Sequence, residues 1–161
     1  DARKKYYEAI SAFKEALERD TRQPLVLVNL AHTYMNQDRM KMARQALAAA
    51  IRMDSNLAPA HEALGFCLFR TRDFGASERA YTYALSCDPR LARAHSGLGS
   101  IKMLRYLDDT TRTGLRLSAM EHWHRSLEID PNQPRIRKLI ARYKPHRADP
   151  ESALLDDESG S

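Results

Sequence analysis

The C-terminal part of this 161-residue chain carries a row of basic side chains whose spacing suits the binding of carboxylates. Arg135, Lys138 and Arg142 are spaced i, i+3 and i+7, so a helix places them on one face. Residues 134–147 contain no acidic residue, whereas residues 148–161 contain five acidic residues and no basic one. Because a guanidinium group binds both oxygens of a carboxylate at once, the basic row is a candidate site for acidic partners.

Residue patterns that would support catalysis or metal binding are weak by comparison. His122 and His124 are two positions apart, so a helix points them in different directions. His61 and His95 share one register of a repeat, which packing explains. The sequence has no glycine-rich phosphate loop, nucleophile elbow or paired cysteine motif. We therefore predict a protein that is not an enzyme and that needs no cofactor or metal.

A repeated pattern positions these side chains. A small residue is followed four positions later by a large apolar one, then by a second small residue, a large aliphatic residue and an aspartate. Successive copies are 34, 34 and then 42 residues apart. A period of this length is typical of stacked helical hairpins, which form binding surfaces and rarely catalyse reactions. The four copies begin at Ala9, Ala43, Ser77 and Ala119.

Helix signals divide the chain into successive pairs of helices. Apolar stripes predict a first helix over about 3–19 and a last one over 134–144, and prolines open the helices between them. Gly65 and Gly99 occupy one register, where we expect two helix backbones to approach closely. The eight additional residues of the third repeat fall within 104–118, and we predict that Asp108 to Gly114 form a projecting loop.

These residues resemble the tetratricopeptide repeat. The pattern divides the chain into residues 1–21 as the second helix of a partial repeat, repeats at 24–57, 58–91 and 92–133, and a capping helix at 134–144. The second repeat matches best, through Leu64, Gly65, Tyr81, Ala84 and Pro89. The resemblance implies an all-α, right-handed superhelical solenoid of about eight helices with a C-terminal capping helix.

In that family the first helix of each hairpin lines a concave groove, which commonly holds a peptide or a partner helix. Carried over by register, the resemblance implies a groove with apolar anchors and a basic end. It consists of Asn29, His32, Met35, Asn36, Glu62, Phe66, Phe69, Arg70, Arg93, Met103, Arg135, Lys138 and Arg142. An alternative is that the phenylalanines are partly core and the cations form a solvated face. The family's chaperone carboxylate clamp is not assigned, because only Asn29 fits it and Val28 and Ala63 do not.

We therefore expect a scaffold that binds a protein or peptide, acidic or with a free C-terminus. Two alternatives remain. A pI near 9.4 and the basic helix suit nucleic acid or another polyanion, although the low aromatic content and the adjoining acidic tail make nucleic acid a poorer candidate. The unpaired flank of residues 1–19 suits self-assembly as a homodimer, or a larger repeat protein whose upstream domains are missing here. Without an apolar run long enough to span a bilayer, we expect a cytoplasmic protein with no membrane span.

The last residues, 145–161, form an acidic tail of low hydrophobicity that we predict to be disordered. Within it, Leu154 and Leu155 precede Asp156, Asp157 and Glu158. This segment is similar to a ligand for a basic and partly apolar groove, either its own or that of a neighbouring molecule. The alternative is a solubilising tail or a linker.

Overall fold

The computed structural model describes residues 2–19 and 23–144, and all of its regular elements there are helices. This confirms the predicted all-α class, with eight helices in the described ranges. They are α1 (Ala2–Arg19), α2 (Pro24–Asn36), α3 (Met40–Met53), α4 (Ala58–Arg70), α5 (Phe74–Cys87), α6 (Ala92–Asp108), α7 (Thr113–Ile129) and α8 (Pro134–Tyr143). The predicted last helix thus ends one residue early, and the acidic tail lies outside the described residues.

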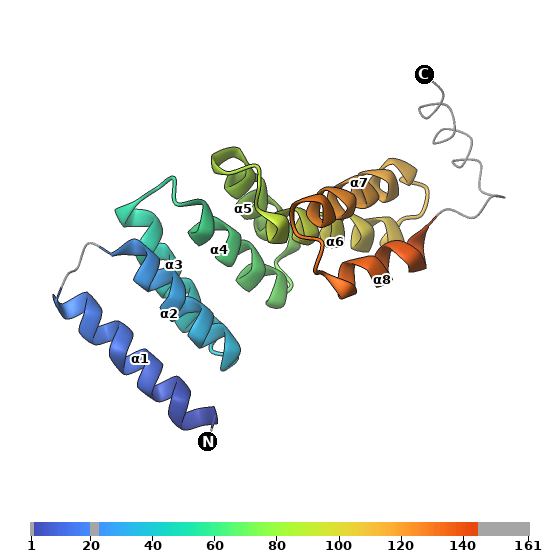
Figure 1. Cartoon of the computed structure of the whole chain (residues 1–161). Coiled ribbons are helices and arrows are strands. Elements are labelled where there is room, and N and C mark those ends of the chain that lie inside the picture. Colours follow the sequence, from blue (N-terminus) through green and yellow to red (C-terminus); the bar gives the residue numbers. More distant parts are fainter. Residues whose placement is uncertain (1, 20–22, 145–161) are drawn as a thin grey trace.

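The helices stack in chain order as a solenoid (Figure 1). The hairpins α2–α3, α4–α5 and α6–α7 each pack on the next, and α1 and α8 lie at opposite ends of the stack. The first helices of the hairpins also contact one another, α2 with α4 and α4 with α6. These three helices therefore form one continuous inner layer, and the second helices lie behind it.

Three of the aspartates that close the blocks lie among the described residues and share one local role. The side chains of Asp54, Asp88 and Asp130 each accept a hydrogen bond from the backbone N–H two residues later, at 2.9–3.0 Å. Each aspartate ends its helix in an extended conformation, and the bond then turns the chain toward the next hairpin. These three aspartates are therefore turn residues.

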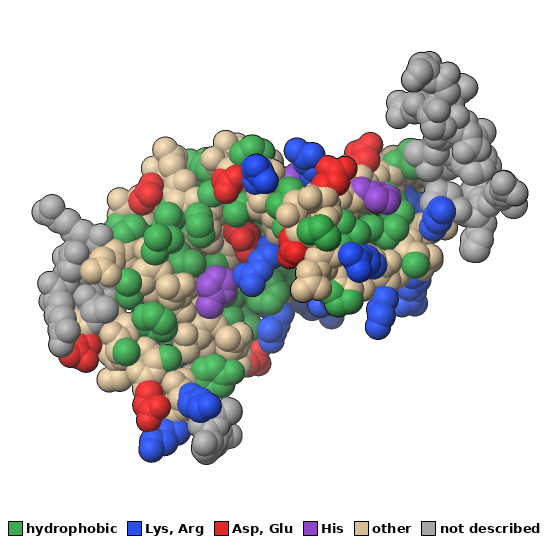
Figure 2. All heavy atoms as spheres, in the orientation of Figure 1, with side chains coloured by type: hydrophobic (Ala, Val, Ile, Leu, Met, Phe, Trp, Pro, Cys, Tyr) green, Lys and Arg blue, Asp and Glu red, His purple; other side chains and the backbone are tan. Residues whose placement is uncertain are grey.

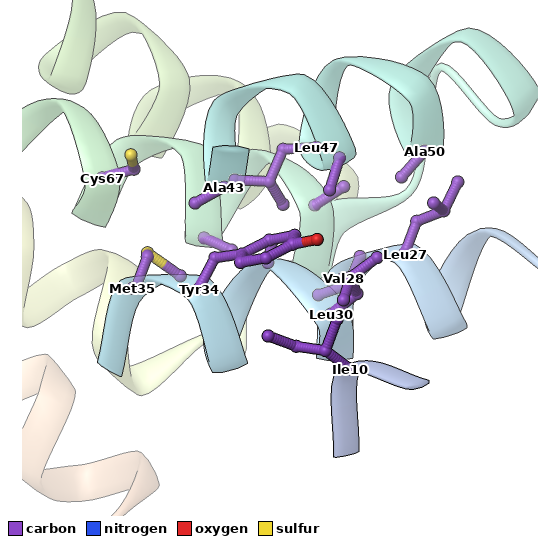
Figure 3. Packing of buried hydrophobic residues seen from close by; sticks show 14 residues of the cluster. Ile10, Leu27, Val28, Leu30, Tyr34, Met35, Ala43, Leu47, Ala50 and Cys67 are labelled. Atoms are coloured by element: carbon purple, nitrogen blue, oxygen red, sulfur yellow. The ribbon is translucent and has the colours of Figure 1, made fainter. Parts of the chain in front are cut away.

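The hydrophobic core is divided into clusters along the stack, as expected where each repeat contacts only its neighbours. Figure 3 shows the first cluster, where Ile10 of α1 lies beside Leu30 of α2, and Leu47 of α3 lies on the opposite side of the Tyr34 ring. The second cluster is centred on Tyr81, and the third on Trp123. Every cluster joins at least two hairpins or a hairpin and a terminal helix, so the repeats stabilise one another.

Glycines in the inner layer make room for two large rings from the outer layer. A Cβ atom added at Gly65 or Gly97 would lie within 2.7 Å of the Tyr81 ring, and one at Gly99 would lie 2.5 Å from Trp123. Gly65 and Gly99 therefore lie at close crossings, as the sequence predicted, and Gly97 adds a third that was not predicted. Tyr81 therefore packs between α4 and α6, and Trp123 packs against α6 and α8.

The additional residues of the third repeat lengthen both of its helices, so the loop is shorter than predicted. Helix α6 has 17 residues where α4 has 13, and α7 has 17 where α5 has 14. Asp108 ends α6 and Gly114 lies inside α7, so residues 109–112 alone connect them. The third hairpin is therefore about one turn longer than its neighbours. The polar composition of this segment suggested a loop because its helical faces are solvated.

Among the described residues, no helix is long and apolar enough to cross a membrane.

Replacement of Gly99 by alanine tests the close crossing. The new methyl group would lie 2.9 Å from the backbone oxygen of Ala119 as well as against Trp123, and a backbone atom cannot rotate away. We expect Gly99→Ala to lower the free energy of unfolding by about 1–3 kcal/mol, the usual cost of overpacking. The control is Gly114→Ala, because nothing lies within 4 Å of a Cβ atom there. It should stabilise α7 by about 0.5–1 kcal/mol. Urea unfolding of both variants checks the contrast, and equal stability of Gly99→Ala and wild type would contradict it.

Candidate functional site

An open cavity of about 620 Å³ lies on the inner face of the stack, toward its C-terminal end. Helices α2, α4, α6 and α8 contribute to its wall, and the rings of Tyr81 and Trp123 reach it from the outer helices. The lining residues are His32, Asn36, Glu62, Phe66, Phe69, Tyr81, Arg93, Ser96, Gly97, Ser100, Met103, Leu104, Leu107, Trp123, Gln133, Pro134, Arg135, Ile136, Leu139 and Tyr143. The cavity therefore joins three hairpins and the terminal helix.

Most of the predicted groove residues line this cavity. They are His32, Asn36, Glu62, Phe66, Phe69, Arg93, Met103 and Arg135. Phe66 is 42% exposed and presents its ring to solvent. Phe69 is half-buried against Phe74, with ring centroids 5.5 Å apart. Phe66 therefore lies on the surface, as the groove prediction requires. Phe69 lies partly in the core, as the alternative stated.

The other predicted groove residues lie elsewhere. Met35 is 3% exposed and packs in the first core cluster, beside Tyr34 in Figure 3. Its register points inward, but its side chain is buried in the core. Arg70 forms an ion pair with Asp38 at 2.9 Å, between the turns of adjacent hairpins. Asn29, Lys138 and Arg142 are exposed and do not line the cavity.

The basic face of α8 extends beyond the cavity. Figure 2 shows Lys and Arg side chains gathered around this end of the molecule. Of the basic row, only Arg135 lines the cavity, and the guanidinium of Arg142 lies 5.5 Å from the ring centroid of Tyr143. Within the described part of the chain, Arg135 has no acidic partner in ion-pair distance. Arg135 is therefore an available cation at the cavity wall.

A second cation, Arg93, begins α6 and faces a buried carboxylate. Its Nη1 atom lies 3.7 Å from Oε1 of Glu62, whose side chain is only 13% exposed. Burial raises the pKa of the Glu62 carboxyl, and the positive charge of Arg93 opposes part of that rise. Burial, together with Arg93, lowers the pKa of His32 on the same wall. At neutral pH His32 is uncharged, so the cationic character of the cavity comes from Arg93 and Arg135.

The hydroxyl group of Tyr81 is an unusual feature of the site. Tyr81 is 3% exposed, and its oxygen has no hydrogen-bond partner among the residues that the structure describes. By contrast, the buried hydroxyls of Ser77 and Ser126 each donate to a backbone carbonyl at 2.7 Å. A buried donor without an acceptor costs about 1–3 kcal/mol. Since Tyr81 lines the cavity, a ligand acceptor placed there can satisfy this donor.

Sequence reasoning missed the residues that enlarge and close the cavity. Leu104 and Leu107 lie at the end of α6, are 41% and 47% exposed, and line the wall. Leu107 belongs to the turn that the insertion adds. Leu139 and Tyr143 of α8 complete the far side. Two large leucines exposed on one helix indicate a contact surface. This signal could have been found in the sequence only if the segment had been recognised as helical.

The histidines pair in a way that spacing did not predict. His95 and His122 bring their Nδ1 atoms to 3.2 Å, and Nε2 of His95 donates to the carbonyl of Pro89 at 3.1 Å. His95 Nδ1 must then accept, so His122 donates to it through Nδ1–H. Burial, followed by His95 and Lys102, lowers the pKa of His122 to about 4. Within the described residues no cluster of three or more potential metal ligands occurs.

The histidine pair predicts a pH dependence of stability. The unfolded chain protonates His122 near its ordinary pKa of 6.5, whereas the folded protein resists protonation down to about pH 4. Stability contributed by the neutral pair is therefore lost as pH falls from about 6.5 to about 4. His122→Gln should lose less stability over this interval than wild type does, as measured by urea unfolding at each pH. His124→Gln, which removes an exposed histidine of the same helix, is the control and should follow wild type. Parallel curves for wild type and His122→Gln would contradict this assignment.

Comparison with known proteins supports the repeat assignment. Residues 2–65 match the family model of the tetratricopeptide repeat. The crystal structure of MamA has a TM-score of 0.67 at 24% identity, over 98% of this chain and 84% of that chain. The Pseudomonas aeruginosa pilF structure has a TM-score of 0.72 at 20% identity, over 88% and 61% of the two chains.

A third solved structure contains a ligand. The first tetratricopeptide-repeat domain of Spaghetti (RPAP3), bound to the HSP90 peptide SRMEEVD, has a TM-score of 0.64 at 19% identity, over 84% of this chain and 96% of that domain. No curated protein matches the sequence significantly. At these low sequence identities the structural similarity shows the fold alone. That fold agrees with the periodic sequence pattern and with the family match. The chain therefore has the helical-repeat solenoid fold of these structures, and its residues 2–65 match the tetratricopeptide repeat.

Proposed function

We propose that this protein is an interaction scaffold whose cavity binds a peptide segment of a partner protein. One observation carries the proposal: an apolar cavity crosses three hairpins, is closed by α8, and contains the cations Arg93 and Arg135 and the unpartnered hydroxyl of Tyr81. The volume of about 620 Å³ lies within the usual range of ligand sites, roughly 300–1,000 Å³. That volume suits a few side chains of an extended segment or one turn of a helix.

The apolar wall provides the affinity in this proposal. Phe66, Leu104 and Leu107 are each more than two-fifths exposed and converge on the cavity from α4 and α6. Large apolar side chains are expensive to leave in water, so a partner that covers them gains the energy of their burial. Leucine, methionine or phenylalanine in the partner would provide the matching contacts.

Charge provides the orientation. Arg93 is largely exposed, and burial disfavours the ionised form of its neighbour Glu62. Arg135 faces the same cavity from α8. Acidic residues next to the apolar anchors would therefore be favoured over basic ones. The HSP90 peptide bound by the related Spaghetti domain is also acidic, which supports this preference. Its binding mode is not transferred, because Val28 and Ala63 are buried here and cannot provide clamp residues.

Binding of a short labelled peptide, with two central leucines flanked by glutamates, tests the proposal. We expect Leu107→Ser to weaken binding about five- to tenfold, because burying the remainder of a leucine side chain is worth about 1–1.5 kcal/mol. Leu25→Ser is a matched control, since Leu25 is a comparably exposed leucine outside the cavity. Fluorescence anisotropy measures both affinities, and a lysine-flanked peptide should bind more weakly than the glutamate-flanked one.

Two outcomes would contradict the peptide-binding proposal. One is equal affinity of Leu107→Ser and Leu25→Ser for the glutamate-flanked peptide. The other is preference for single-stranded nucleic acid with a steep loss of affinity between about 50 and 200 mM salt, which would instead favour polyanion binding by the basic helix.

Tyr81→Phe separates a binding role of the hydroxyl from a packing role. Removing an unsatisfied buried donor should raise the melting temperature, because phenylalanine keeps the ring between α4 and α6 without the polar atom. The same change should weaken peptide binding about three- to tenfold if the hydroxyl donates to the ligand. A merely structural tyrosine would move both measurements in one direction. A lower melting temperature, or unchanged affinity, would remove Tyr81 from the site.

A further inference from the structure

We propose that residues 151–158 of the chain itself are the resting occupant of the cavity and are displaced when a partner binds. This inference rests on the proposed function, because it requires that the cavity bind an acidic and apolar segment. It goes beyond that function by naming an internal competitor. The consequence is a scaffold whose availability to partners is set by its own C-terminal segment.

The chemistry of the segment complements that of the cavity. Leu154 and Leu155 form its apolar centre, and Glu151 and Asp156 to Glu158 place carboxylates on both sides. The cavity offers the exposed faces of Leu104 and Leu107 to the leucines. It offers Arg93 and Arg135 to the carboxylates. No other part of the sequence combines adjacent leucines with acids on both sides.

The segment can also reach the cavity. Tyr143, the last residue of α8, itself lines the wall, so the chain that follows starts at the site. Leu154 is 11 residues further along. An extended chain of that length spans up to about 36 Å, which is ample to return to the starting wall. Residues 144–150 therefore suffice as a linker.

Electrostatics favours the return of the segment. Helix α8 presents Arg135, Arg137, Lys138 and Arg142 without an acidic residue among them. The five carboxylates of residues 148–161 follow directly, with no basic residue among them. Two opposite charge blocks joined by a short linker attract one another, most strongly at low ionic strength.

The linkage makes even weak binding effective. A segment on a short flexible linker has an effective concentration in the millimolar range. An intrinsic dissociation constant of about 0.1 mM would then leave the cavity occupied in about nine-tenths of the molecules. Under that occupancy the apparent affinity for an external peptide falls about tenfold, in proportion to the free fraction.

The test measures binding of the glutamate-flanked peptide to full-length variants by fluorescence anisotropy. Leu154→Ser combined with Leu155→Ser removes the apolar centre of the segment and lies outside α1–α8, so circular dichroism should be unchanged. We expect this variant to bind the peptide about tenfold more tightly than wild type. The matched control, Ser152→Ala with Ser159→Ala, changes the same segment without altering its leucines or charges and should bind as wild type does.

The outcomes distinguish the inference from the function on which it rests. If wild type and the leucine variant bind the peptide equally well, and Leu107→Ser still weakens that binding, the internal competitor is wrong and the proposed function stands. If none of the proteins binds the peptide, the proposed function is wrong and the inference falls with it. If wild type sediments as a dimer that the leucine variant abolishes, the segment occupies a second copy, which overturns the intramolecular form proposed here.

Discussion

The close packing of two aromatic rings against glycines of the inner helices holds the stack together around its cavity. Tyr81 and Trp123 start on the outer helices α5 and α7, and both line the cavity on the inner face. They fit because Gly65, Gly97 and Gly99 leave no side chain in their path. Tyr81 packs between α4 and α6 of adjacent hairpins, Trp123 packs against α6 and α8, and both rings line the cavity. The same residues therefore pack the stack and line the proposed binding site.

A local extension gives this stack its asymmetry. The lengthened α6–α7 hairpin adds one turn at the end of the groove, and that turn carries Leu107 into the cavity wall. Helix α8 closes the same end and contributes Arg135 and Leu139. The inner layer thereby acquires a distinct apolar cavity at one end. Cations lie at the margin of this cavity. Under the proposed function, this asymmetry would give a bound segment a preferred position and direction.

Burial determines the charge of the cavity. Glu62 is held where its ionised form is disfavoured, with Arg93 as its partner, and His32 is kept neutral. The positive charges of Arg93 and Arg135 are consequently the ones that a ligand meets. The unpartnered hydroxyl of Tyr81 lies in the same cavity and adds a donor that the free protein does not satisfy within its described residues. A carboxylate or carbonyl oxygen of a ligand would interact favourably with these cations and would accept a hydrogen bond from this hydroxyl.

Residue size at a fixed period was enough to predict the repeat, the helical hairpins, the close crossings at Gly65 and Gly99, and most of the inner face. Periodicity could not decide that Met35 is buried in the core, that Arg70 is paired with Asp38, or that the loop between α6 and α7 is confined to residues 109–112. Nor could it bring His95 to His122, or Tyr81 to the cavity. Those outcomes depend on which neighbouring hairpin contacts each side chain, and on how far α6 continues. Only tertiary structure sets both, because burial and charge pairing are properties of the assembled stack.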